Sequence, residues 1–313
     1  EKLGRKPKRE AEARTKQILE QFYQKTQGEI TRSFLSHMIM RLESEQSVKE
    51  YLDIMDHRKT EQLIDTLDKV EQNRKECYIR EFSIEHFHDS KVFETLIPKI
   101  CKIFREENEE LTGFENEEIL AEYQIYKTPG YVYMKGNVQI YSAGKQAADI
   151  SAFPEGIAVA VGSEEDVPDI CPDQTIDKVF TIENLTSFYR FKQEHSLVIY
   201  LGGYHNHSRR NLLMQIYQKL PDAQYYHFGD LDAGGFYILE HLKRKTGIPF
   251  QMFQMDIETL KKYEDYAKPL TENDKKRLMQ LEKMELPDEE RKLITYMLQK
   301  GIKLEQECIS KSR

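Results

Sequence analysis

Apolar residues in the first third of the chain recur at the spacing of α-helices. One apolar face contains Ile18, Leu19 and Phe22, and similar faces occur in residues 34–42 and 63–70. Side chains three and four positions apart lie on one side of a helix, so each segment predicts an amphipathic helix. Residues 77–84 (CYIREFSI) then have the composition of a strand. Helices followed by a short strand favour a winged-helix domain and a plain helical bundle about equally.

The middle of the chain combines one further helix with short strands. Residues 92–104 are amphipathic and predict a helix. Residues 131–141 place apolar positions on both sides of Gly136 and Asn137, which predicts a β-hairpin. A short apolar run at residues 158–161 lies among several prolines. We therefore expect a small β-rich connector in this region.

The pattern changes again after residue 175, where strands alternate with helices. Apolar runs of strand length occupy residues 178–182, 197–201 and 224–228, and amphipathic helices are expected over 208–220 and 233–245. Such alternation predicts βαβ units and a parallel sheet. From residue 256 onward the chain is charged and predicted to be helical.

Three acidic residues follow strands of this predicted sheet. Glu183 comes directly after the first strand, and Asp230 and Asp232 come directly after the third. The carboxyl ends of parallel strands meet at one edge of a sheet, which is where sites form in open α/β folds. Side chains two positions apart in an extended segment point to the same side, so Asp230 and Asp232 can face one point.

This set of carboxylates favours a site for a divalent cation. Carboxylate oxygens are ligands that Mg²⁺ prefers, with substrate phosphate completing its shell. Such an ion beside a phosphodiester stabilises developing charge and activates water. Glu183 is expected to act as a ligand or as a general base. A structural interpretation competes with this one, because Asp232 is also well placed to cap a helix that begins at Ala233.

Several strings in the chain resemble a known family. Residues 181–188 (TIENLTSF), 200–204 (YLGGY) and 227–236 (HFGDLDAGGF) look like a Toprim domain. More specifically, they resemble the JetD family, the nuclease subunits of the bacterial Wadjet anti-plasmid system. Residues 88–91 (HDSK, where the family more usually has GDSK) and 304–307 (LEQE) also match it.

The resemblance implies an architecture and a function. Members of this family are related to the A subunit of archaeal type IIB topoisomerase, and they pair a winged-helix domain with a Toprim domain. They cleave double-stranded DNA with divalent metal and act with an SMC-like condensin complex (JetABC-type subunits) that recognises closed circular plasmids. Their N-terminal part is usually longer, so part of an arm domain is expected to be absent here.

Carried over by motif, the resemblance implies a site of five acids. Glu183, Asp230 and Asp232 correspond to the catalytic Toprim acids and would bind Mg²⁺ or Mn²⁺. Glu305 and Glu307 are candidates to join them as metal ligands. The number of ions and the oligomeric state, including a homodimer, stay open.

The related topoisomerases attack phosphate with a tyrosine, and this chain does not show that motif. Tyr23, Tyr51 and Tyr78 precede the predicted connector, but none lies in a recognisable string of that kind. We therefore expect hydrolysis by metal-activated water. The alternatives are a non-catalytic DNA-binding module and a transesterase of the topoisomerase type.

The predicted fold class is α+β with several domains. Residues 1–88 are expected to form a helical or winged-helix-like DNA-binding region, and residues 89–174 a helix with the β-rich connector. Residues 175–313 are expected to form the Toprim nuclease domain, a parallel α/β sheet with a helical C-terminal extension.

The net charge of −8 does not exclude DNA as a binding partner. Residues 105–122, with one Arg and eight Glu, contribute −7, and the first sixteen residues are basic. Arg209, Arg210 and Lys91 are expected phosphate contacts, although the start of a solvated helix explains the two arginines equally well.

The cysteines and the apolar runs indicate the cellular compartment. The four cysteines are scattered, which argues against a zinc site and fits a reducing cytosol. No apolar run reaches the length of a membrane span. We therefore expect a cytoplasmic protein that does not enter a membrane, and the resemblance to the JetD family implies a bacterial one.

Overall fold

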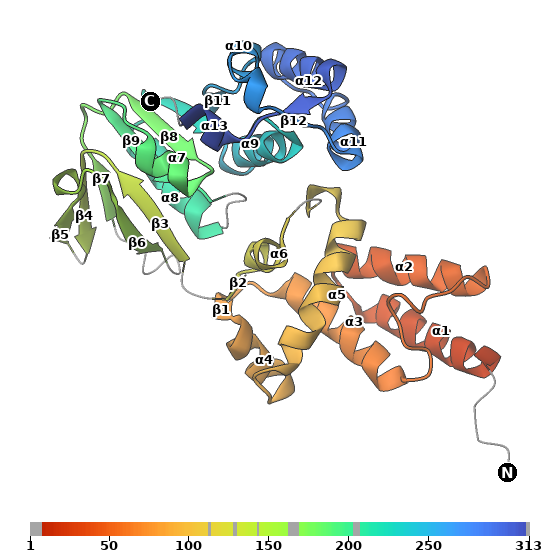
Figure 1. The fold of residues 1–313 in the computed structure, drawn as a ribbon. Coiled ribbons are helices and arrows are strands. Elements are labelled where there is room, and N and C mark those ends of the chain that lie inside the picture. Colours follow the sequence, from red (N-terminus) through yellow and green to blue (C-terminus); the bar gives the residue numbers. More distant parts are fainter. Residues whose placement is uncertain are drawn as a thin grey trace. The chain divides into compact units, whose positions relative to one another are not determined.

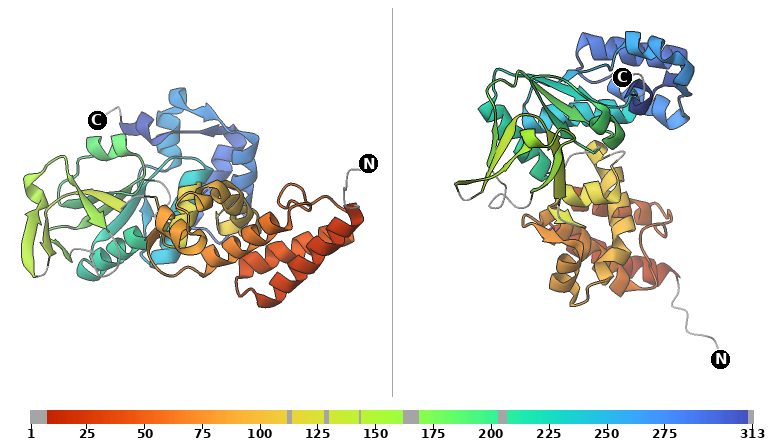
Figure 2. Two further views of the ribbon diagram at one scale, coloured as in Figure 1. Left: turned by 90° about the horizontal axis from the view of Figure 1, so that it is seen from below. Right: turned by 60° about the vertical axis from the view of Figure 1, so that its left-hand side comes forward.

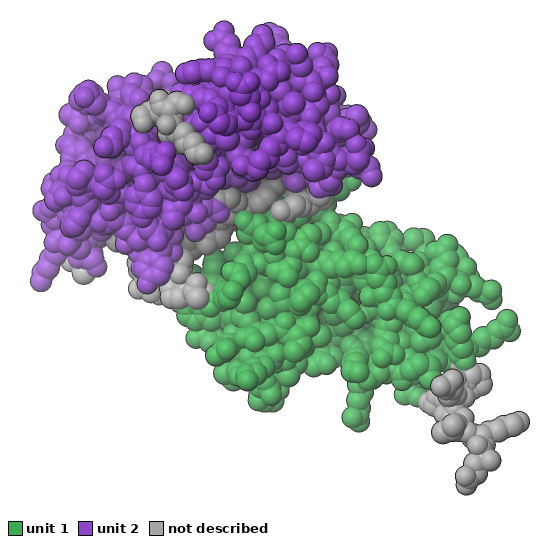
Figure 3. Space-filling model, in the orientation of Figure 1, with its two compact units in different colours: residues 1–128 green, residues 129–313 purple. Residues whose placement is uncertain are grey.

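The computed structural model describes residues 8–111, 114–127, 130–142, 144–161, 169–202 and 207–310. The chain divides into two compact units, residues 1–128 and residues 129–313 (Figure 3). Among the described residues, no helix is both long enough and apolar enough to cross a membrane.

Unit 1 is mainly helical, as its hydrophobic pattern predicts (Figure 1). Its core contains fully buried side chains from successive helices, among them Leu19, Leu35, Leu67 and Phe104. Its elements are α1 (Lys8–Lys25), α2 (Glu29–Glu43), α3 (His57–Gln72), β1 (Cys77–Tyr78), α4 (Ile79–Phe87), α5 (Val92–Glu107), η1 (Glu109–Leu111), α6 (Asn116–Glu122) and β2 (Ile125–Tyr126).

The strand predicted over residues 77–84 is wrong beyond its first two residues. Only β1 is extended, and it pairs in parallel with β2. Helix α4 starts at Ile79 because the Glu81 carboxylate accepts the backbone N–H of Tyr78 at 2.8 Å, which satisfies a donor at the helix start.

The acidic segment 105–122 covers the end of α5, η1 and α6, apart from residues 112 and 113, which lie outside the described residues. The winged-helix assignment stays a prediction.

Unit 2 is built on a six-stranded mixed sheet with the order β11-β10-β8-β9-β3-β6. Its strands are β3 (Gly130–Lys135), β6 (Ile157–Val161), β8 (Lys178–Ile182), β9 (Ser196–Tyr200), β10 (Gln224–Phe228) and β11 (Gln251–Met252). The parallel pairing of β8 with β9 and β10 confirms the prediction from the three apolar runs. The β3 strand is antiparallel to its neighbours, so the fold is α+β with both strand directions in one sheet.

Three helices connect the parallel strands. They are α7 (Leu185–Arg190), α8 (His207–Lys219) and α9 (Ala233–Thr246). Helix α8 packs against α9, whereas α7 packs against α13 (Gln306–Ser310). This division fits right-handed crossovers, because the chain moves from β8 to β9 in one direction and returns past β8 to β10 in the other.

The hairpin predicted around Gly136 and Asn137 is wrong, because the two strands belong to different sheets. Strand β4 (Val138–Ser142) pairs with β5 (Lys145–Asp149) and β7 (Asp169–Pro172) in a three-stranded antiparallel sheet. Gly136 has a φ of +139°, and a Cβ there would lie 2.5 Å from the carbonyl oxygen of Ser196. Only glycine allows this close approach, which redirects the chain from β3 into the second sheet.

The C-terminal region is mainly helical and gathers on one side of unit 2 (Figures 1 and 2). Its side chains share a core with the sheet and its helices, including Phe180, Phe236, Leu278 and Met297. The remaining elements of unit 2 are η2 (Ile150–Ala152), α10 (Ile257–Lys262), η3 (Glu264–Tyr266), β12 (Lys268–Pro269), α11 (Glu272–Leu281), α12 (Asp288–Lys300) and β13 (Ile302–Lys303).

Candidate functional site

Glu183 and Asp230 lie side by side at the carboxyl ends of β8 and β10. The pairing of these strands continues one step past β8, where the backbone N–H of Glu183 donates to the Phe228 carbonyl at 3.1 Å. The backbone N–H of Asp230 lies 3.3 Å from Glu183 Oε2 and donates to it. The sheet edge thus brings together two acids that are 47 positions apart in the sequence.

Asp232 begins α9 as its N-cap. Its Oδ1 accepts the backbone N–H of Gly235 at 2.9 Å, so the helix-capping interpretation of this residue is confirmed. The cap uses one carboxylate oxygen. A metal-binding role for Asp232 stays a prediction.

The LEQE segment also reaches this edge. Leu304 and Leu231 form an isolated antiparallel bridge, with backbone hydrogen bonds of 2.9 and 3.1 Å. The next residues, Glu305, Gln306 and Glu307, are therefore held next to the segment that carries Asp230.

Gln306 is a central residue of the site that sequence reasoning missed. Its backbone N–H donates to Asp230 Oδ1 at 2.7 Å. Its buried side-chain amide accepts the backbone N–H of Asn184 at 2.8 Å and donates to the Phe228 carbonyl at 2.6 Å. Gln306 thereby links the ends of β8 and β10. The LEQE string contains Gln306, but the prediction made from that string concerned only its two carboxylates.

Glu305 and Glu307 both have partners of their own. Glu305 forms an ion pair with Lys268, and its side chain is 48% exposed. Glu307 Oε1 accepts a hydrogen bond from the side-chain amide of Asn184 at 2.5 Å. Both carboxylates are near enough to Asp230 to influence its ionisation.

Asp230 carries the clearest electrostatic signature of the site. Burial raises its pKa from 3.8 to about 6. The hydrogen bond from Gln306 opposes this rise, and the negative charges of Asp232, Glu307 and Glu305 add to it. A buried carboxylate among other carboxylates is costly to ionise unless a cation is present.

The chemistry of the donors fits a hard divalent cation. All five predicted acids offer oxygen atoms, as Mg²⁺ and Mn²⁺ prefer. Within the described residues, however, no three His, Cys, Asp or Glu side chains form a ready metal-binding group. The ion therefore stays a prediction that rests on the kind of donor and on the electrostatics of Asp230.

The two predicted arginines differ in their surroundings. Arg209 donates from Nη1 to the Leu201 carbonyl at 2.7 Å, just beyond β9. It also lies near Tyr200. Burial raises the pKa of Tyr200 above its usual value, the charge of Arg209 opposes this rise, and the charge of Glu183 adds to it. Arg210 is only 7% exposed. Its charge helps to lower the pKa of the buried His241 on α9.

The other sequence motifs lie elsewhere. Lys91 belongs to unit 1, where its side chain is exposed and its backbone N–H donates to Asp89 Oδ1 at 2.7 Å. Gly203 and Tyr204 of the YLGGY string lie outside the described residues.

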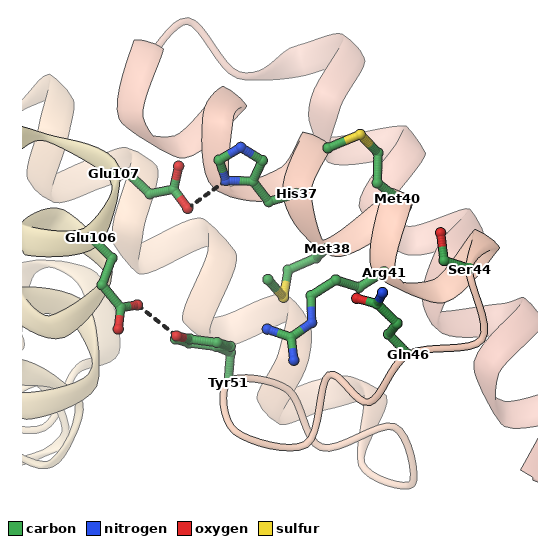
Figure 4. A pocket seen from close by; sticks show the side chains of 9 residues that line it. All are labelled: His37, Met38, Met40, Arg41, Ser44, Gln46, Tyr51, Glu106 and Glu107. Carbon is green, nitrogen blue, oxygen red and sulfur yellow. Dashed lines mark hydrogen bonds and ion pairs between the residues drawn. The ribbon is translucent and has the colours of Figure 1, made fainter.

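Unit 1 also contains a cavity of about 410 Å³ next to Tyr51 (Figure 4). Tyr51 donates its hydroxyl to Glu106 at 2.6 Å, and His37 Nδ1 is hydrogen-bonded to Glu107 Oε1 at 2.9 Å. Burial and the bond to Glu106 raise the pKa of Tyr51 well above its usual range. A tyrosine held in this way is a poor nucleophile, because its phenolate is disfavoured.

Comparison with known proteins identifies related sequences. Residues 165–312 match the family described as "Wadjet protein JetD, C-terminal". The chain is also 28% identical over 263 residues to the Wadjet protein JetD of Bacillus cereus (strain Q1), an alignment that includes 82% of this chain and 63% of the relative. The chain thus spans less than two thirds of that protein's length. These findings confirm the resemblance that the sequence motifs indicated.

Proposed function

From this confirmed kinship with JetD, we propose that the chain is the nuclease component of a Wadjet-type plasmid-defence system. Its activity would be metal-dependent hydrolysis of double-stranded DNA by a Toprim domain. The observation that carries this proposal is the gathering of carboxylates around Asp230, whose pKa is raised to about 6. Perturbed acids at the carboxyl edge of a parallel sheet are typical of functional sites.

Each residue of the site has a proposed role. Glu183, Asp230 and Asp232 would hold Mg²⁺ or Mn²⁺, with Glu305 and Glu307 nearby as further ligands. The ion would supply charge neutralisation at the scissile phosphate and a lowered pKa for water. Arg209 is better placed than the buried Arg210 to contact phosphate at this edge. Lys91, on unit 1, would contact DNA independently.

The partners follow from the same kinship and are proposals as well. The substrate would be closed circular plasmid DNA, presented by an SMC-like condensin complex of JetABC-type subunits. Because such a complex would find and present the substrate, cleavage by the isolated chain is expected to be weak.

One observation favours a second candidate, a DNA-binding module without catalysis. Asp232 caps α9, and Glu305 pairs with Lys268, so some of the acids have structural tasks already. For a transesterase of the topoisomerase type, Tyr51 is a poor nucleophile because it is buried and its hydroxyl is donated to Glu106.

Plasmid linearisation in Mg²⁺ or Mn²⁺ tests the proposal, with the isolated chain and with the condensin subunits added. Glu183→Gln and Asp230→Asn should each lower the rate about a hundredfold or more. Asp222→Asn is the matched control, because this exposed residue precedes β10 at the opposite end of the strand. Cleavage that survives both site substitutions would contradict a catalytic role for these acids. A covalent protein–DNA adduct lost on mutating one tyrosine would exclude hydrolysis.

A further inference from the structure

Lys268 reaches the acidic edge of the sheet from a segment that none of the recognised motifs includes. It lies in β12, which pairs antiparallel with β13, so that Lys268 is opposite Lys303. A backbone hydrogen bond of 2.8 Å from the N–H of Leu270 to the Gly301 carbonyl continues this pairing. The pairing holds Lys268 beside the stretch of chain that leads into the LEQE segment.

The ammonium group of Lys268 forms an ion pair with Oε1 of Glu305. The side chain of Lys268 is 56% exposed, and that of Glu305 is 48% exposed. Ion pairs between side chains exposed to this extent are weak, because water and dissolved ions compete for both groups. This pair can therefore open without disturbing the fold, and a stronger partner can replace either member.

The charges of the acidic edge act on Lys268 as well. The hydrogen bond to Glu305 raises the pKa of Lys268, and the negative charges of Glu305 and Glu307 add to this rise. The charges of the same two glutamates help to raise the pKa of Asp230. Lys268 thus brings positive charge to the group of acids around Asp230.

Lys268 occupies a carboxylate oxygen that a divalent cation at this edge would need. Carboxylate oxygens are the ligands that Mg²⁺ prefers, and Glu305 is one of the proposed ligands. An ammonium group and a metal ion compete for the same oxygen, and two positive charges in such proximity repel each other. Binding of a cation at Glu305 and the ion pair of Glu305 with Lys268 therefore oppose each other.

We infer that Lys268 sets the affinity of the metal site by competing with the divalent cation for Glu305. The ammonium group holds the carboxylate until the cation displaces it, and only then does Glu305 complete the coordination. Lys268 is a positioning residue, because it acts through Glu305 and does not take part in the chemistry at the phosphate. The inference rests on the proposed function, since it requires that the acidic edge binds a divalent cation.

Titration calorimetry of the full chain with Mn²⁺ alone tests this competition. Lys268→Gln should bind Mn²⁺ about threefold to tenfold more tightly than the wild type, because a competing and repelling charge has been removed. Lys268→Arg keeps the charge and should bind Mn²⁺ no more tightly than the wild type. Lys275→Gln is the matched control and should leave the affinity unchanged, because this lysine forms a similar exposed ion pair with Glu272.

The dependence on Glu305 is tested by combining two substitutions. Glu305→Gln removes the carboxylate for which the two cations compete, so adding Lys268→Gln to it should raise the affinity by less than about twofold. An unchanged affinity in Lys268→Gln would overturn the inference. An equal gain with and without the Glu305 carboxylate would overturn it as well, because the effect would then be general repulsion.

Plasmid cleavage with the condensin subunits present separates this inference from the proposed function. The Mn²⁺ concentration for half-maximal cleavage should fall in Lys268→Gln by the same factor as the affinity rises. A wild type that binds Mn²⁺ and cleaves, with no gain in Lys268→Gln, would contradict the inference alone. A gain in affinity without any cleavage would support the inference and contradict the nuclease activity. A wild type that neither binds Mn²⁺ nor cleaves would contradict both.

Discussion

The backbone N–H of Gln306 donates to Oδ1 of Asp230 at 2.7 Å, across 76 positions of the chain. This bond ties the last part of the chain to the sheet edge. The side-chain amide of Gln306 adds two more bonds, to the backbone of Asn184 and of Phe228. Gln306, two positions after the bridge between Leu231 and Leu304, thus holds in place the segments that carry Glu183 and Asp230.

Replacing Gln306 by Ala should destabilise the protein. The substitution leaves the partly buried N–H of Asn184 without its partner, which costs about 1–3 kcal/mol. It also removes one of the two donors to the Phe228 carbonyl, which keeps the backbone N–H of Glu183. We expect the free energy of unfolding to fall by about 2–4 kcal/mol, measured by urea denaturation. Gln299→Ala, on the exposed side of α12, is the control and should change it by less than about 0.5 kcal/mol. Equal stability of the two variants would show that the amide is dispensable.

Asp230 should make the stability of the metal-free protein depend on pH. Its folded-state pKa of about 6 is above the unfolded value of 3.8, so ionisation of Asp230 weakens the fold. The stability that the protonated carboxyl provides is fully present below about pH 4, is lost as the pH rises through about 6, and stays lost above it. Asp230→Asn cannot ionise, so it should be about 3 kcal/mol more stable than the wild type above pH 6 and equal to it well below pH 4.

The measurement is urea denaturation of both proteins in chelator at several pH values. Asp222→Asn, which removes an exposed carboxylate at the other end of β10, should show no such pH-dependent difference. Added Mg²⁺ or Mn²⁺ should stabilise the wild type more than Asp230→Asn. A difference between wild type and Asp230→Asn that is constant from pH 4 to 7 would contradict the burial of an ionised carboxylate here.

Local sequence patterns were sufficient for the central part of the fold. The strands β8 and β9 are buried on both faces and β10 is mostly buried, so their sequences are rich in apolar and aromatic residues and easy to recognise. The position of Glu183 and Asp230 follows from these strands. Their proximity could therefore be predicted without the structure.

Other features depend on contacts that no local pattern contains. The bridge between Leu231 and Leu304 joins distant segments by backbone atoms alone, which leave no trace in the sequence. Residues 79–87 are helical because of a bond from Tyr78 to Glu81, although their composition suits a strand. The burial of Arg210 next to His241 depends on how α8 packs against α9.

The neighbouring glycines of α9 should respond in opposite ways to alanine. A Cβ on Gly235 would lie 2.2 Å from the Asp230 carbonyl oxygen, a backbone atom that cannot move alone. Gly235→Ala should therefore cost about 1–3 kcal/mol and displace Asp230. A Cβ on Gly234 would meet only the Asp232 side chain, whose nearest atom is Oδ1 at 3.1 Å.

Gly234→Ala is thus the matched control, one position away in the same helix. It should be neutral or stabilising by up to about 1 kcal/mol, because alanine favours helices more than glycine does. Thermal unfolding of both variants measures the contrast. If the two substitutions had the same effect, the close approach of Gly235 to Asp230 would be refuted.

Glu71 on α3 caps the first turn of α2, and its loss should weaken unit 1. The N-cap residue Gly28 has no side chain, and the buried Glu71 carboxylate instead accepts the backbone N–H groups of Ile30 and Thr31, each at 2.8 Å. It also accepts the Thr31 hydroxyl at 2.7 Å. These donors would otherwise lack partners at a helix start.

Glu71→Ala should therefore lower the free energy of unfolding by about 2–4 kcal/mol, since hydrogen bonds to charged groups contribute about 1.5–3 kcal/mol each and do not add fully. Glu61→Ala, an exposed position of the same helix, is the control. Glu71→Gln should fall between the two, because its amide oxygen can still accept while its amide nitrogen cannot. A loss in Glu71→Ala no larger than in Glu61→Ala would mean that water replaces the carboxylate at the start of α2.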